Sequence, residues 1–542
     1  MATDWSLRTV PPDLTARYLA EGFWTDDTFG SFLERGATVH PNQELRIWSP
    51  TNPYRGPLSE VQARARHLAG GLRGLGVGPG DVVSYQMPNR IEAVVTFWAL
   101  SLLGVVVVPV VHFYGPKELS FILGESGAVL HLTDAAWGHL DYAENLRSID
   151  APALEHVVVV SDAALPRGWH RFSEVTDAPP IDAYAVDPDA PAVVAYTSGT
   201  TANPKGVVHS HHTLLAEVRQ LSRLQEPERR PVLIGAPVAH AIGMLGGLLG
   251  PIHRGVDAHI ADGWDPARVL AAMVEAQICA GSGATYFFTS LLDHPDFGEE
   301  HRRLMGVIGL GGAPVPAAVG ERAAALGITV TRSYGSTELP STTGSLPSDP
   351  HQQRCYTDGT PMPGVEVRLV DDDDNEVAEG EPGEILARGP ELFLGYTDAA
   401  LTARAVDREG WYRTGDIAVR DEHGAFTITD RISDIIIRGG TNVSAAEVEE
   451  ELMRLPCVAE VAVVAAPDER LGEHGCAFVR TSPGATPPSL VEVRRHLENV
   501  GLARQKWPEE LRSVEEFPRT PSGKIKKFEL RSALRAETDA GS

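Results

Sequence analysis

The uncharged stretch from Ala93 to Phe113 constrains the fold more than any other feature of this 542-residue chain. Its 21 residues are long enough to cross a bilayer as one apolar helix. However, Ala93–Leu103 is typical of a buried helix, and Gly104 is a good helix stop. Val105–Val111 is β-branched with one proline, which indicates a strand. A helix followed directly by a strand predicts a buried α/β core, and we therefore expect no integral membrane segment.

Strand-like and helix-like segments alternate along the chain up to Gly359. The predicted strands include Asp81–Tyr85, Val129–Leu132, His156–Val160, Ala192–Ala195, Val232–Ala236, Met305–Leu310 and Ile328–Val330. This alternation predicts a mostly parallel sheet with helices on both faces. After Gly359, short strands separated by turns indicate an all-β subdomain. A charged link at Asp430–Asp434 precedes a tail whose pattern predicts a small α+β domain.

Length and charge narrow the class of protein. A chain of 542 residues is too long for one hydrophobic core, so we expect at least two domains. The net charge of −26 argues against a general nucleic-acid binder, which needs a basic surface. The four cysteines are scattered without zinc-ligand spacing, and the N-terminus resembles no signal peptide. These features favour a cytoplasmic protein.

The segment Tyr196–Gly206 has the composition of a phosphate-binding loop. Six consecutive small residues, Thr197–Ala202, include four hydroxyl side chains, and Lys205 adds a positive charge. Small residues let successive backbone N–H groups face one anion. The segment is not a Walker A motif, because it lacks the Gly-Lys-Ser/Thr ending. A flexible surface loop is the alternative, but Pro204-Lys205-Gly206 and the apolar flanks favour a phosphate site.

Three further clusters follow predicted strands. His240 comes where a strand ends, and spacing alone leaves a ligand contact and a buried hydrogen bond equally open. Gly311–Pro314 permits close backbone approach to a flat ligand. Ser333–Glu338 combines an aromatic ring, hydroxyls and a carboxylate, which suits a base, a phosphate and Mg²⁺. Asp416 is a candidate partner for a ribose diol.

Several other polar residues favour ordinary structural roles. His209, His211 and His212 lie at a helix entry without an accompanying carboxylate or cysteine, so capping or packing is favoured over metal binding. Asp371–Asp374 is expected to be a solvated hairpin tip. Lys524 follows a Ser-Gly turn, and by itself it indicates a basic surface turn.

Taken together, these clusters resemble the adenylate-forming superfamily, which includes acyl-CoA synthetases. The resemblance runs from Leu58 to Arg531 and consists of several motifs in the family's order. The matching segments are Thr197–Lys205, Pro237–Gly243, Gly311–Pro314, Tyr334–Glu338, Gly383–Tyr396, Tyr412–Asp416, Asp430–Gly440 and Pro521–Lys524. Two positions depart from the family's usual pattern: Ala202 in the phosphate loop, and Ser433 at the hinge.

The resemblance implies an α/β fold. Two doubly wound α/β subdomains and a β subdomain would form a large N-terminal domain, residues 1–432. A small mobile α+β domain, residues 433–542, would carry the catalytic lysine and rotate about Ser433. The reaction it implies is activation of a carboxylic acid by MgATP to an acyl-adenylate, followed by transfer of the acyl group to coenzyme A.

The resemblance also implies roles for individual residues. The β- and γ-phosphates would be held by Thr197, Ser198, Gly199, Thr200, Thr201 and Lys205. The rest of the ATP site would comprise Gly312, Ala313, Pro314, Tyr334, Gly335, Ser336, Thr337, Asp416, Ile428, Arg431 and Lys524. Catalysis would depend on Lys524, Thr337, Glu338 and His240, with Glu338 also the Mg²⁺ ligand. The acid pocket would be lined by Ala239, His240, Met244, Tyr286, Gly311 and Gly312, and coenzyme A would pass Gly439 and Gly440.

The acid is expected to be apolar, because no acidic residue in the pocket segments would pair with an amino group. Two alternatives differ in class: an acyl-AMP ligase that loads a phosphopantetheinyl carrier protein, and a non-catalytic nucleotide-binding homologue. Lys205, Glu338, Asp416 and Lys524 argue against the second alternative. The expected partners are an acid, ATP and coenzyme A, without nucleic acid, and the expected assembly is a monomer or homodimer.

Overall fold

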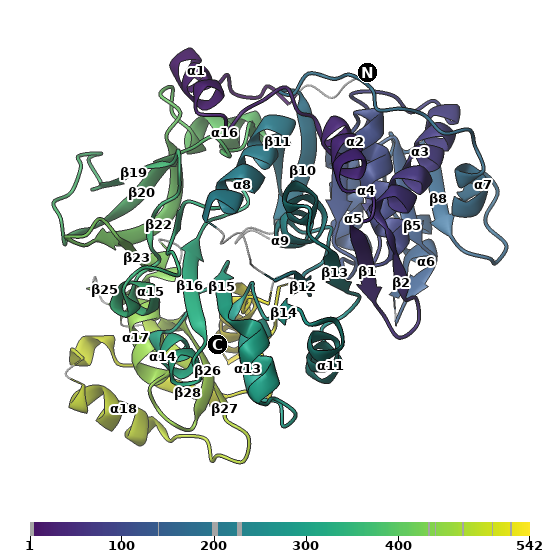
Figure 1. The fold of residues 1–542 in the computed structure, drawn as a ribbon. Coiled ribbons are helices and arrows are strands. Elements are labelled where there is room, and N and C mark those ends of the chain that lie inside the picture. The colour runs from purple at the N-terminus through teal and green to yellow at the C-terminus, as the bar shows by residue number, and fades with distance from the viewer. Residues whose placement is uncertain are drawn as a thin grey trace.

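The structure is a computed structural model that describes residues 5–138, 140–197, 204–224, 230–431, 434–438, 441–468, 471–500, 502–520 and 523–541. Figure 1 shows a large N-terminal part and a smaller C-terminal part, coloured yellow-green, below the β subdomain. The mixed α/β architecture confirms the expected fold class. None of the helices in the described part of the chain combines the length and hydrophobicity needed to cross a bilayer.

The first sheet has eight strands in the order β21-β11-β10-β4-β3-β5-β8-β9. These are β3 (Val82–Gln86), β4 (Val106–Val110), β5 (Leu130–Asp134), β8 (His156–Val160), β9 (Trp169–Arg171), β10 (Pro191–Thr197), β11 (Lys205–Ser210) and β21 (Gly395–Tyr396). Nearby helices are α2 (Phe29–Val39), α3 (Leu58–Gly74), α4 (Ile91–Leu103), α5 (Pro116–Ser126), α6 (Tyr142–Arg147), α7 (Phe172–Thr176) and α8 (His211–Leu224). The helix α4 ends at Gly104, whose φ is +66°, and β4 follows at once, as the sequence predicts.

The strands that flank the phosphate loop differ from the predicted parallel arrangement. β10 and β4 are parallel, but β10 and β11 are antiparallel, and Thr197 pairs with Lys205. A parallel connection needs a crossover of a dozen or more residues, whereas this connection is short enough only for a hairpin. Both ends of the loop are therefore fixed in one ladder.

A second sheet contains β1 (Glu44–Trp48), β2 (Tyr54–Pro57), β12 (Val232–Ile234), β13 (Ala258–Ala261) and β14 (Cys279–Ala280). A third contains β15 (Val307–Gly311), β16 (Thr329–Tyr334), β17 (Thr343–Gly344) and β18 (Thr360–Pro361). Their helices are α11 (Pro266–Ala276), α12 (Thr285–Leu292), α13 (Glu299–Met305), α14 (Ala317–Ala325) and α15 (His351–Tyr356). The parallel strands β15 and β16 direct Gly311 and Tyr334 toward the same sheet edge.

A glycine-rich helical segment, residues 241–254, has irregular geometry. It comprises α9 (Ala241–Gly243), a π-helix (Met244–Leu249) and α10 (Gly250–Arg254). A side chain at Gly243 would collide with the carbonyl oxygen of Pro237, 2.0 Å from its Cβ position. Single π turns are rare and occur often at functional sites.

The β subdomain is one antiparallel sheet of β19 (Glu366–Val370), β20 (Pro382–Arg388), β22 (Tyr412–Arg420) and β23 (Phe426–Arg431), with α16 (Ala399–Ala405) beside it. Asp371–Asp374 is the exposed tip between β19 and β20, as expected.

The C-terminal part is α+β, as predicted. Its strands are β24 (Ile436–Arg438), β25 (Thr441–Val443), β26 (Val458–Asp468), β27 (Gly472–Thr481) and β28 (Glu510–Ser513). Its helices are α17 (Ala445–Leu452), α18 (Leu490–Asn499), a 3₁₀ turn (Arg504–Lys506) and α19 (Lys527–Gly541). The boundary at residue 433 stays a prediction, because Ser433 lies outside the described residues.

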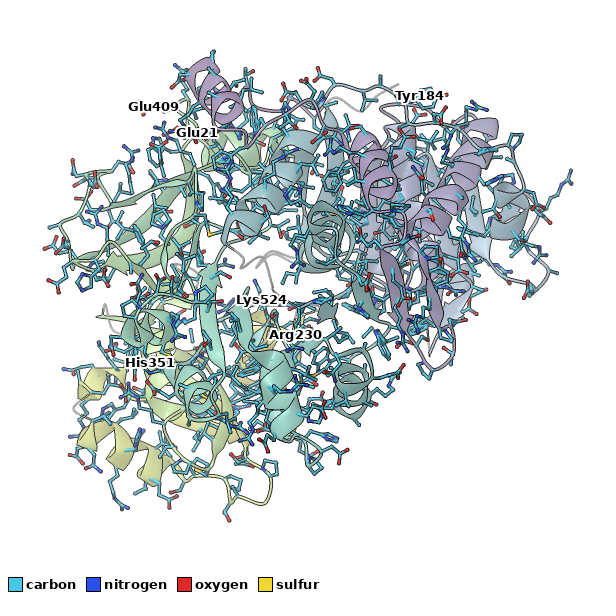
Figure 2. All side chains as sticks on the ribbon, in the orientation of Figure 1. Glu21, Tyr184, Arg230, His351, Glu409 and Lys524 are labelled. Carbon is cyan, nitrogen blue, oxygen red and sulfur yellow. The ribbon has the colours of Figure 1, made fainter. Side chains whose placement is uncertain are left out.

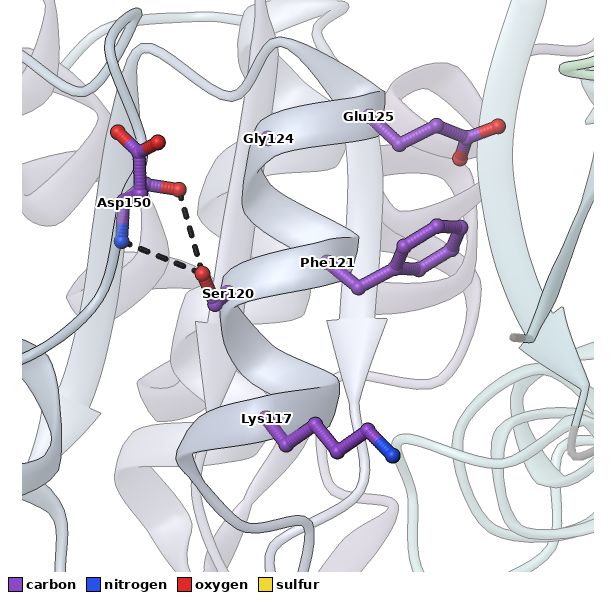
Figure 3. A pocket seen from close by; sticks show the side chains of 6 residues that line it. All are labelled: Lys117, Ser120, Phe121, Gly124, Glu125 and Asp150. Atoms are coloured by element: carbon purple, nitrogen blue, oxygen red, sulfur yellow. Dashed lines mark hydrogen bonds between the residues drawn. The ribbon is translucent and has the colours of Figure 1, made fainter. Parts of the chain in front are cut away.

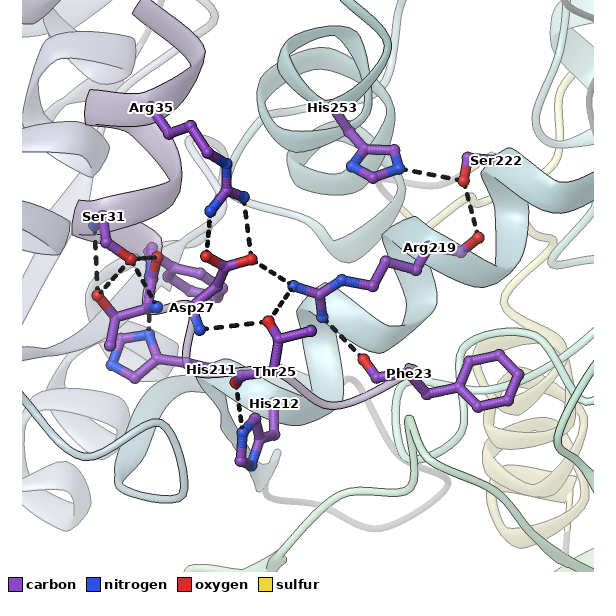
Figure 4. Close-up of polar contacts among 12 residues, drawn as sticks. Phe23, Thr25, Asp27, Ser31, Arg35, His211, His212, Arg219, Ser222 and His253 are labelled. Atoms are coloured by element: carbon purple, nitrogen blue, oxygen red, sulfur yellow. Dashed lines mark hydrogen bonds and ion pairs between the residues drawn. The ribbon is translucent and has the colours of Figure 1, made fainter. Parts of the chain in front are cut away.

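The N-terminal segment after α1 (Pro12–Ala20) is attached to α8 by a polar network (Figure 4). Arg219 donates to Thr25 and Asp27, both at 2.7 Å, and Arg35 also pairs with Asp27. His212 contacts the Asp189 carboxylate and the Thr25 carbonyl, each at 2.7 Å. His211 accepts from the N–H of Phe29 at 3.2 Å. These separate contacts confirm a packing role for both histidines.

Candidate active site

Lys524 projects from the C-terminal part toward residues of the N-terminal part. Figure 2 shows it near the centre of the molecule. Its Cε lies 3.9 Å from the position that a Cβ on Gly312 would occupy. Although Lys524 keeps contact with solvent, neighbouring protein atoms partly desolvate its amine. This desolvation, with the charge of Arg431, lowers its pKa to about 8, and the charges of Asp416 and Glu338 oppose the shift. Lys524 therefore reaches the residues that the sequence assigns to ATP.

A tight turn carries Lys524. The N–H of Thr520 donates to the Lys524 carbonyl oxygen at 2.7 Å, and the N–H of Lys524 donates to the Thr520 hydroxyl at 3.0 Å. Gly523 has a φ of +85°, a conformation that other residues rarely adopt. Arg519 donates to the Gly523 carbonyl at 3.0 Å and stacks over the Tyr286 ring at 4.8 Å. Tyr286, predicted to line the acid pocket, thus also packs against the turn that carries the lysine.

Tyr334 and Asp416 are brought together from two sheets. The Tyr334 hydroxyl donates to Asp416 Oδ2 at 2.6 Å, and Arg431 Nε donates to Oδ1 at 2.7 Å. Asp416 is 4% exposed. Tyr334 and Ile428 pack on the same apolar cluster beneath the β subdomain. The predicted adenine, ribose and Arg431 positions therefore form one connected surface.

The loop after Tyr334 folds back on itself. The N–H of Ser336 donates to the Leu339 carbonyl at 3.0 Å, and the Ser336 hydroxyl accepts from the Leu339 N–H. A Cβ on Gly335 would lie 2.0 Å from the Pro340 carbonyl oxygen, so only glycine fits there. The loop thereby presents Thr337 and Glu338 on a fixed turn.

Glu338 is connected to the phosphate-loop lysine through an aromatic ring. The buried Tyr396 hydroxyl donates to Glu338 Oε1 at 2.7 Å. Lys205 Nζ lies 5.5 Å from the centre of the Tyr396 ring, within the range of a cation–π contact. Tyr396 appeared in the sequence only within a matching segment, and its place between these two charges was not predicted.

His209 was also missed as a functional residue. It is 1% exposed, and burial lowers its pKa to about 4, so the imidazole is neutral at pH 7. A carbonyl oxygen only accepts, so Nε2–H donates to Thr337 O at 2.8 Å. Nδ1 then accepts from the Thr213 hydroxyl at 3.0 Å. The strand after the phosphate loop thus holds the backbone of Thr337.

Replacing His209 by alanine is expected to lower kcat for the predicted adenylate formation ~10-fold or more, because it would displace Thr337, the residue predicted to bind the α-phosphate. His209→Gln should recover part of the loss, since its amide N–H can donate to the same carbonyl. Pyrophosphate-release kinetics measure both. His253→Ala, on a surface histidine bonded to Ser222, is the control (Figure 4). Full activity of His209→Ala would contradict the role of His209 in positioning Thr337.

A buried carboxyl supports the same loop from behind. The Ser341 hydroxyl donates to Glu217 Oε1 at 2.6 Å. Burial raises the pKa of Glu217 to about 7, and burial followed by the charge of Glu217 raises that of Glu391 well above its usual value. A folded-state pKa above the unfolded value means that the folded protein binds more protons between about pH 4.5 and pH 7. Stability contributed by Glu217 is therefore lost as pH rises through this window.

Glu217→Gln is expected to raise the Tm above that of the original protein at pH 8, because the amide carries no charge to bury and can still accept from Ser341. The difference should shrink steadily toward pH 5. Thermal unfolding followed by circular dichroism across this range measures it. A Tm difference that does not change with pH would contradict the assignment.

One side of the candidate site is apolar. Ala239 and Met244 are 5% and 2% exposed. His240 begins α9, and its Nδ1 accepts from the Ile242 N–H at 3.3 Å. Burial, with the charge of Lys524, lowers the pKa of His240 to about 4. The imidazole is therefore neutral, with its proton on Nε2.

Gly311 and Gly312 lie at the end of β15 beside this apolar side. A Cβ on Gly312 would lie 3.4 Å from Ile242 Cδ1, and Gly312 has a φ of +74°. The adjoining Ala313 is half-buried and Pro314 is exposed. The predicted residues Ser198, Gly199, Thr200, Thr201, Ser433, Gly439 and Gly440 lie outside the described residues, as does Ala202.

A surface cavity of about 540 Å³ lies apart from the candidate site (Figure 3). It is lined by Lys117, Ser120, Phe121, Gly124, Glu125 and Asp150. Glu125 accepts from the hydroxyls of Tyr196 and Thr397, the latter at 2.6 Å. This carboxylate therefore supports the end of β10 from the cavity side, and the cavity contains none of the predicted site residues.

Comparison with known proteins decides the family. Residues 33–397 match the AMP-binding enzyme family, and residues 447–524 match the AMP-binding enzyme C-terminal domain. The chain belongs to the AMP-binding enzyme family. This AMP-binding enzyme is of the acyl-CoA synthetase type: an ATP-dependent, AMP-forming ligase that joins a carboxylic acid to coenzyme A.

The names of its relatives refer to chemically different acids. It is 32% identical over 526 residues to the medium-chain fatty-acid–CoA ligase of Escherichia coli strain K12, covering 96% of this chain and 92% of that protein. It is 31% identical over 544 residues to the 2-hydroxy-7-methoxy-5-methyl-1-naphthoate–CoA ligase of Streptomyces carzinostaticus, covering 96% of each. The crystal structure of the anthranilate CoA ligase AuaEII with anthranoyl-AMP superimposes with a TM-score of 0.85 at 25% identity, covering 95% of this chain and 98% of that one.

Proposed function

We propose that this enzyme activates an apolar carboxylic acid, with Lys524 as the group that assists adenylate formation. The observation that carries the proposal is the position of the Lys524 side chain, whose Cε lies 3.9 Å from the Cβ position of Gly312. There the charges of Asp416 and Glu338 act on it. A cation at this point meets both an incoming carboxylate and the α-phosphate.

In the first step, an oxygen of the substrate carboxylate attacks the α-phosphorus of ATP. A new P–O bond forms, the bond to the bridging oxygen of the β-phosphate breaks, and pyrophosphate leaves. Lys524 would neutralise charge on both reactants, and Thr337 would bind the α-phosphate. Thr197, Lys205 and the loop between them would hold the departing phosphates. In the second step, the sulfur of coenzyme A forms a bond to the acyl carbon, and AMP leaves.

Magnesium fits the residues beside Thr337. Glu338 offers a carboxylate of which Oε1 accepts from Tyr396, and Mg²⁺ in nucleotide sites commonly uses one or two carboxylates with phosphate oxygens. When bound, the ion would neutralise phosphate charge. Tyr396 would hold the orientation of the Glu338 carboxylate. Asp416, oriented by Tyr334 and Arg431, would accept from the ribose hydroxyls.

The apolar nature of the acid is supported by the buried side chains of Ala239 and Met244 and by the neutral His240 between them. An ammonium group would find no carboxylate among these residues. Neutral imidazole presents an N–H to the substrate carboxylate without a competing charge. Tyr286 would close the pocket while it packs on the turn of Lys524.

A pyrophosphate-release screen tests the proposal. We expect release with straight-chain, cyclic or aromatic apolar acids, and none with α-amino acids. Adding coenzyme A or a phosphopantetheinylated carrier protein in separate arms identifies the acceptor, and we expect thioester with coenzyme A. Release with amino acids alone would overturn the apolar pocket. Absence of pyrophosphate release with every acid in the screen would favour the non-catalytic alternative.

We further propose a monomeric or homodimeric protein of a reducing, cytoplasmic compartment. The reducing compartment is supported by Cys355, Cys457 and Cys476, none of which takes part in a disulfide.

A further inference from the structure

A cluster of metal-ligating side chains lies outside the active site, on α14 and α15. His351 and Cys355 occupy positions i and i+4 of α15, and Glu321 comes from α14. One ligand atom from each residue lies within 4.8 Å of the others. Figure 2 shows His351 well apart from Lys524. The reaction described above uses none of these residues.

The distances suit coordination by a tetrahedral ion. His351 Nδ1 lies 3.6 Å from Cys355 Sγ. Zinc bonds of about 2.3 Å to sulfur and about 2.0 Å to nitrogen, at a tetrahedral angle, separate those two ligand atoms by about 3.5 Å. No rearrangement of α15 is needed to bring the pair to one ion. Residues four apart on a helix lie on one face, which makes such a pair a chelate.

The third residue completes the arrangement. Glu321 Oε1 lies 3.1 Å from Nε2, the other nitrogen of the same imidazole, and also accepts from the Tyr356 hydroxyl at 2.9 Å. A histidine that binds a metal through one nitrogen commonly donates its other N–H to a carboxylate. Glu321 would fix the tautomer in which Nδ1 is free to bind the ion.

We propose that His351, Cys355 and Glu321 form a site for a zinc-class divalent cation, with Cys355 Sγ and His351 Nδ1 as ligands and Glu321 as the carboxylate that orients the histidine. On binding, the thiol loses its proton to solvent, a sulfur–metal bond forms and water leaves the ion. Burial, with the charge of Glu321, raises the pKa of Cys355, so the ion must displace this proton.

The site lies beside the C-terminal part. The N–H of Ala317, at the start of α14, donates to Glu450 Oε1 on α17 at 3.2 Å. Figure 1 shows α14, α15 and α17 grouped together. A bound ion would therefore sit near one of the contacts between the two parts.

Cobalt(II) titration of the full chain, without nucleotide and with a phosphine reductant, tests the site. A thiolate–cobalt bond produces a near-ultraviolet charge-transfer band, which a carboxylate site cannot. We expect the band at one equivalent of cobalt and its loss when zinc is added. Absence of the band would overturn the proposal, and the thiol would then only donate a hydrogen bond to His351.

Variants locate the ion. Cys355→Ser should abolish the band, whereas Cys457→Ser, at another free cysteine, should leave it unchanged. His351→Gln and Glu321→Gln should each weaken cobalt binding ~10-fold or more. A band that survives Cys355→Ser, or moves with Cys457→Ser, would overturn the assignment. If Cys355→Ser fails to fold, His351→Gln decides, because this exposed residue is not part of the core, and unchanged affinity there would also overturn it.

Discussion

Lys524→Ala is expected to lower the rate of acyl-adenylate formation ~10²- to 10³-fold, the usual cost of removing one group that stabilises transition-state charge. The same variant should still form thioester from coenzyme A and acyl-adenylate prepared separately, because attack at the acyl carbon needs no cation at the α-phosphate. Pyrophosphate release measures the first half-reaction, and thioester formation from added adenylate measures the second.

Lys526→Ala is the matched control. Lys526 lies two residues further along the same turn and pairs with Glu529 at 2.8 Å. The Lys526→Ala variant should retain the activity of the original protein in both half-reactions. Equal loss of both half-reactions in Lys524→Ala would contradict the assignment of Lys524 to adenylate formation alone.

The pH dependence of kcat/KM for ATP provides a second test of the role of Lys524. Its pKa is lowered to about 8, and only the protonated amine carries the charge that the phosphate needs. The value of kcat/KM for ATP reports groups of the free enzyme, so it should fall as pH rises through about 8. Lys524→Arg should lack this decline, because guanidinium stays charged. If the original protein and Lys524→Arg both showed the decline in kcat/KM, the titrating group would be a residue other than Lys524.

The local elements of the fold follow from the sequence because they depend on neighbouring residues. The end of α4 at Gly104 and the exposed Asp371–Asp374 tip require only backbone preference and polarity. The hairpin between β10 and β11 was not predicted, because strand direction depends on which partner each strand finds. The π-helix was also missed, since apolar residues and glycines are compatible with either helix.

The residues of the candidate site also fall into two groups, those that the local sequence predicts and those that it does not. Motif residues such as Tyr334 and Asp416 were found individually, but their hydrogen bond joins positions 82 residues apart. His209 and Tyr396 act through contacts with Thr337 and Glu338, which local pattern does not encode. Lys524 has the local pattern of a surface turn, and only the packing of two distant parts brings it to the residues predicted to bind ATP. The arrangement of the site therefore depends on long-range contacts, which could not be predicted from the local sequence.

Glu338→Gln should lower kcat/KM for adenylate formation ~10²-fold and shift the Mg²⁺ dependence to higher concentration, because the amide can still accept from Tyr396 but brings no charge to the ion. Tyr396→Phe is the matched variant: it removes the 2.7 Å hydrogen bond and keeps the carboxylate. Its loss should be smaller, with a modest shift in Mg²⁺ dependence.

Magnesium titrations of pyrophosphate release compare the two variants with the original protein. The thioester step from added adenylate should be nearly unaffected in both, because pyrophosphate has already left. If Glu338→Gln kept the original Mg²⁺ dependence, the carboxylate would not be a ligand, and its role would reduce to holding Tyr396 beneath Lys205. Glutamine preserves the size of the side chain. Comparing Glu338→Gln with the original protein therefore isolates the effect of the charge at position 338 from the shape of the turn.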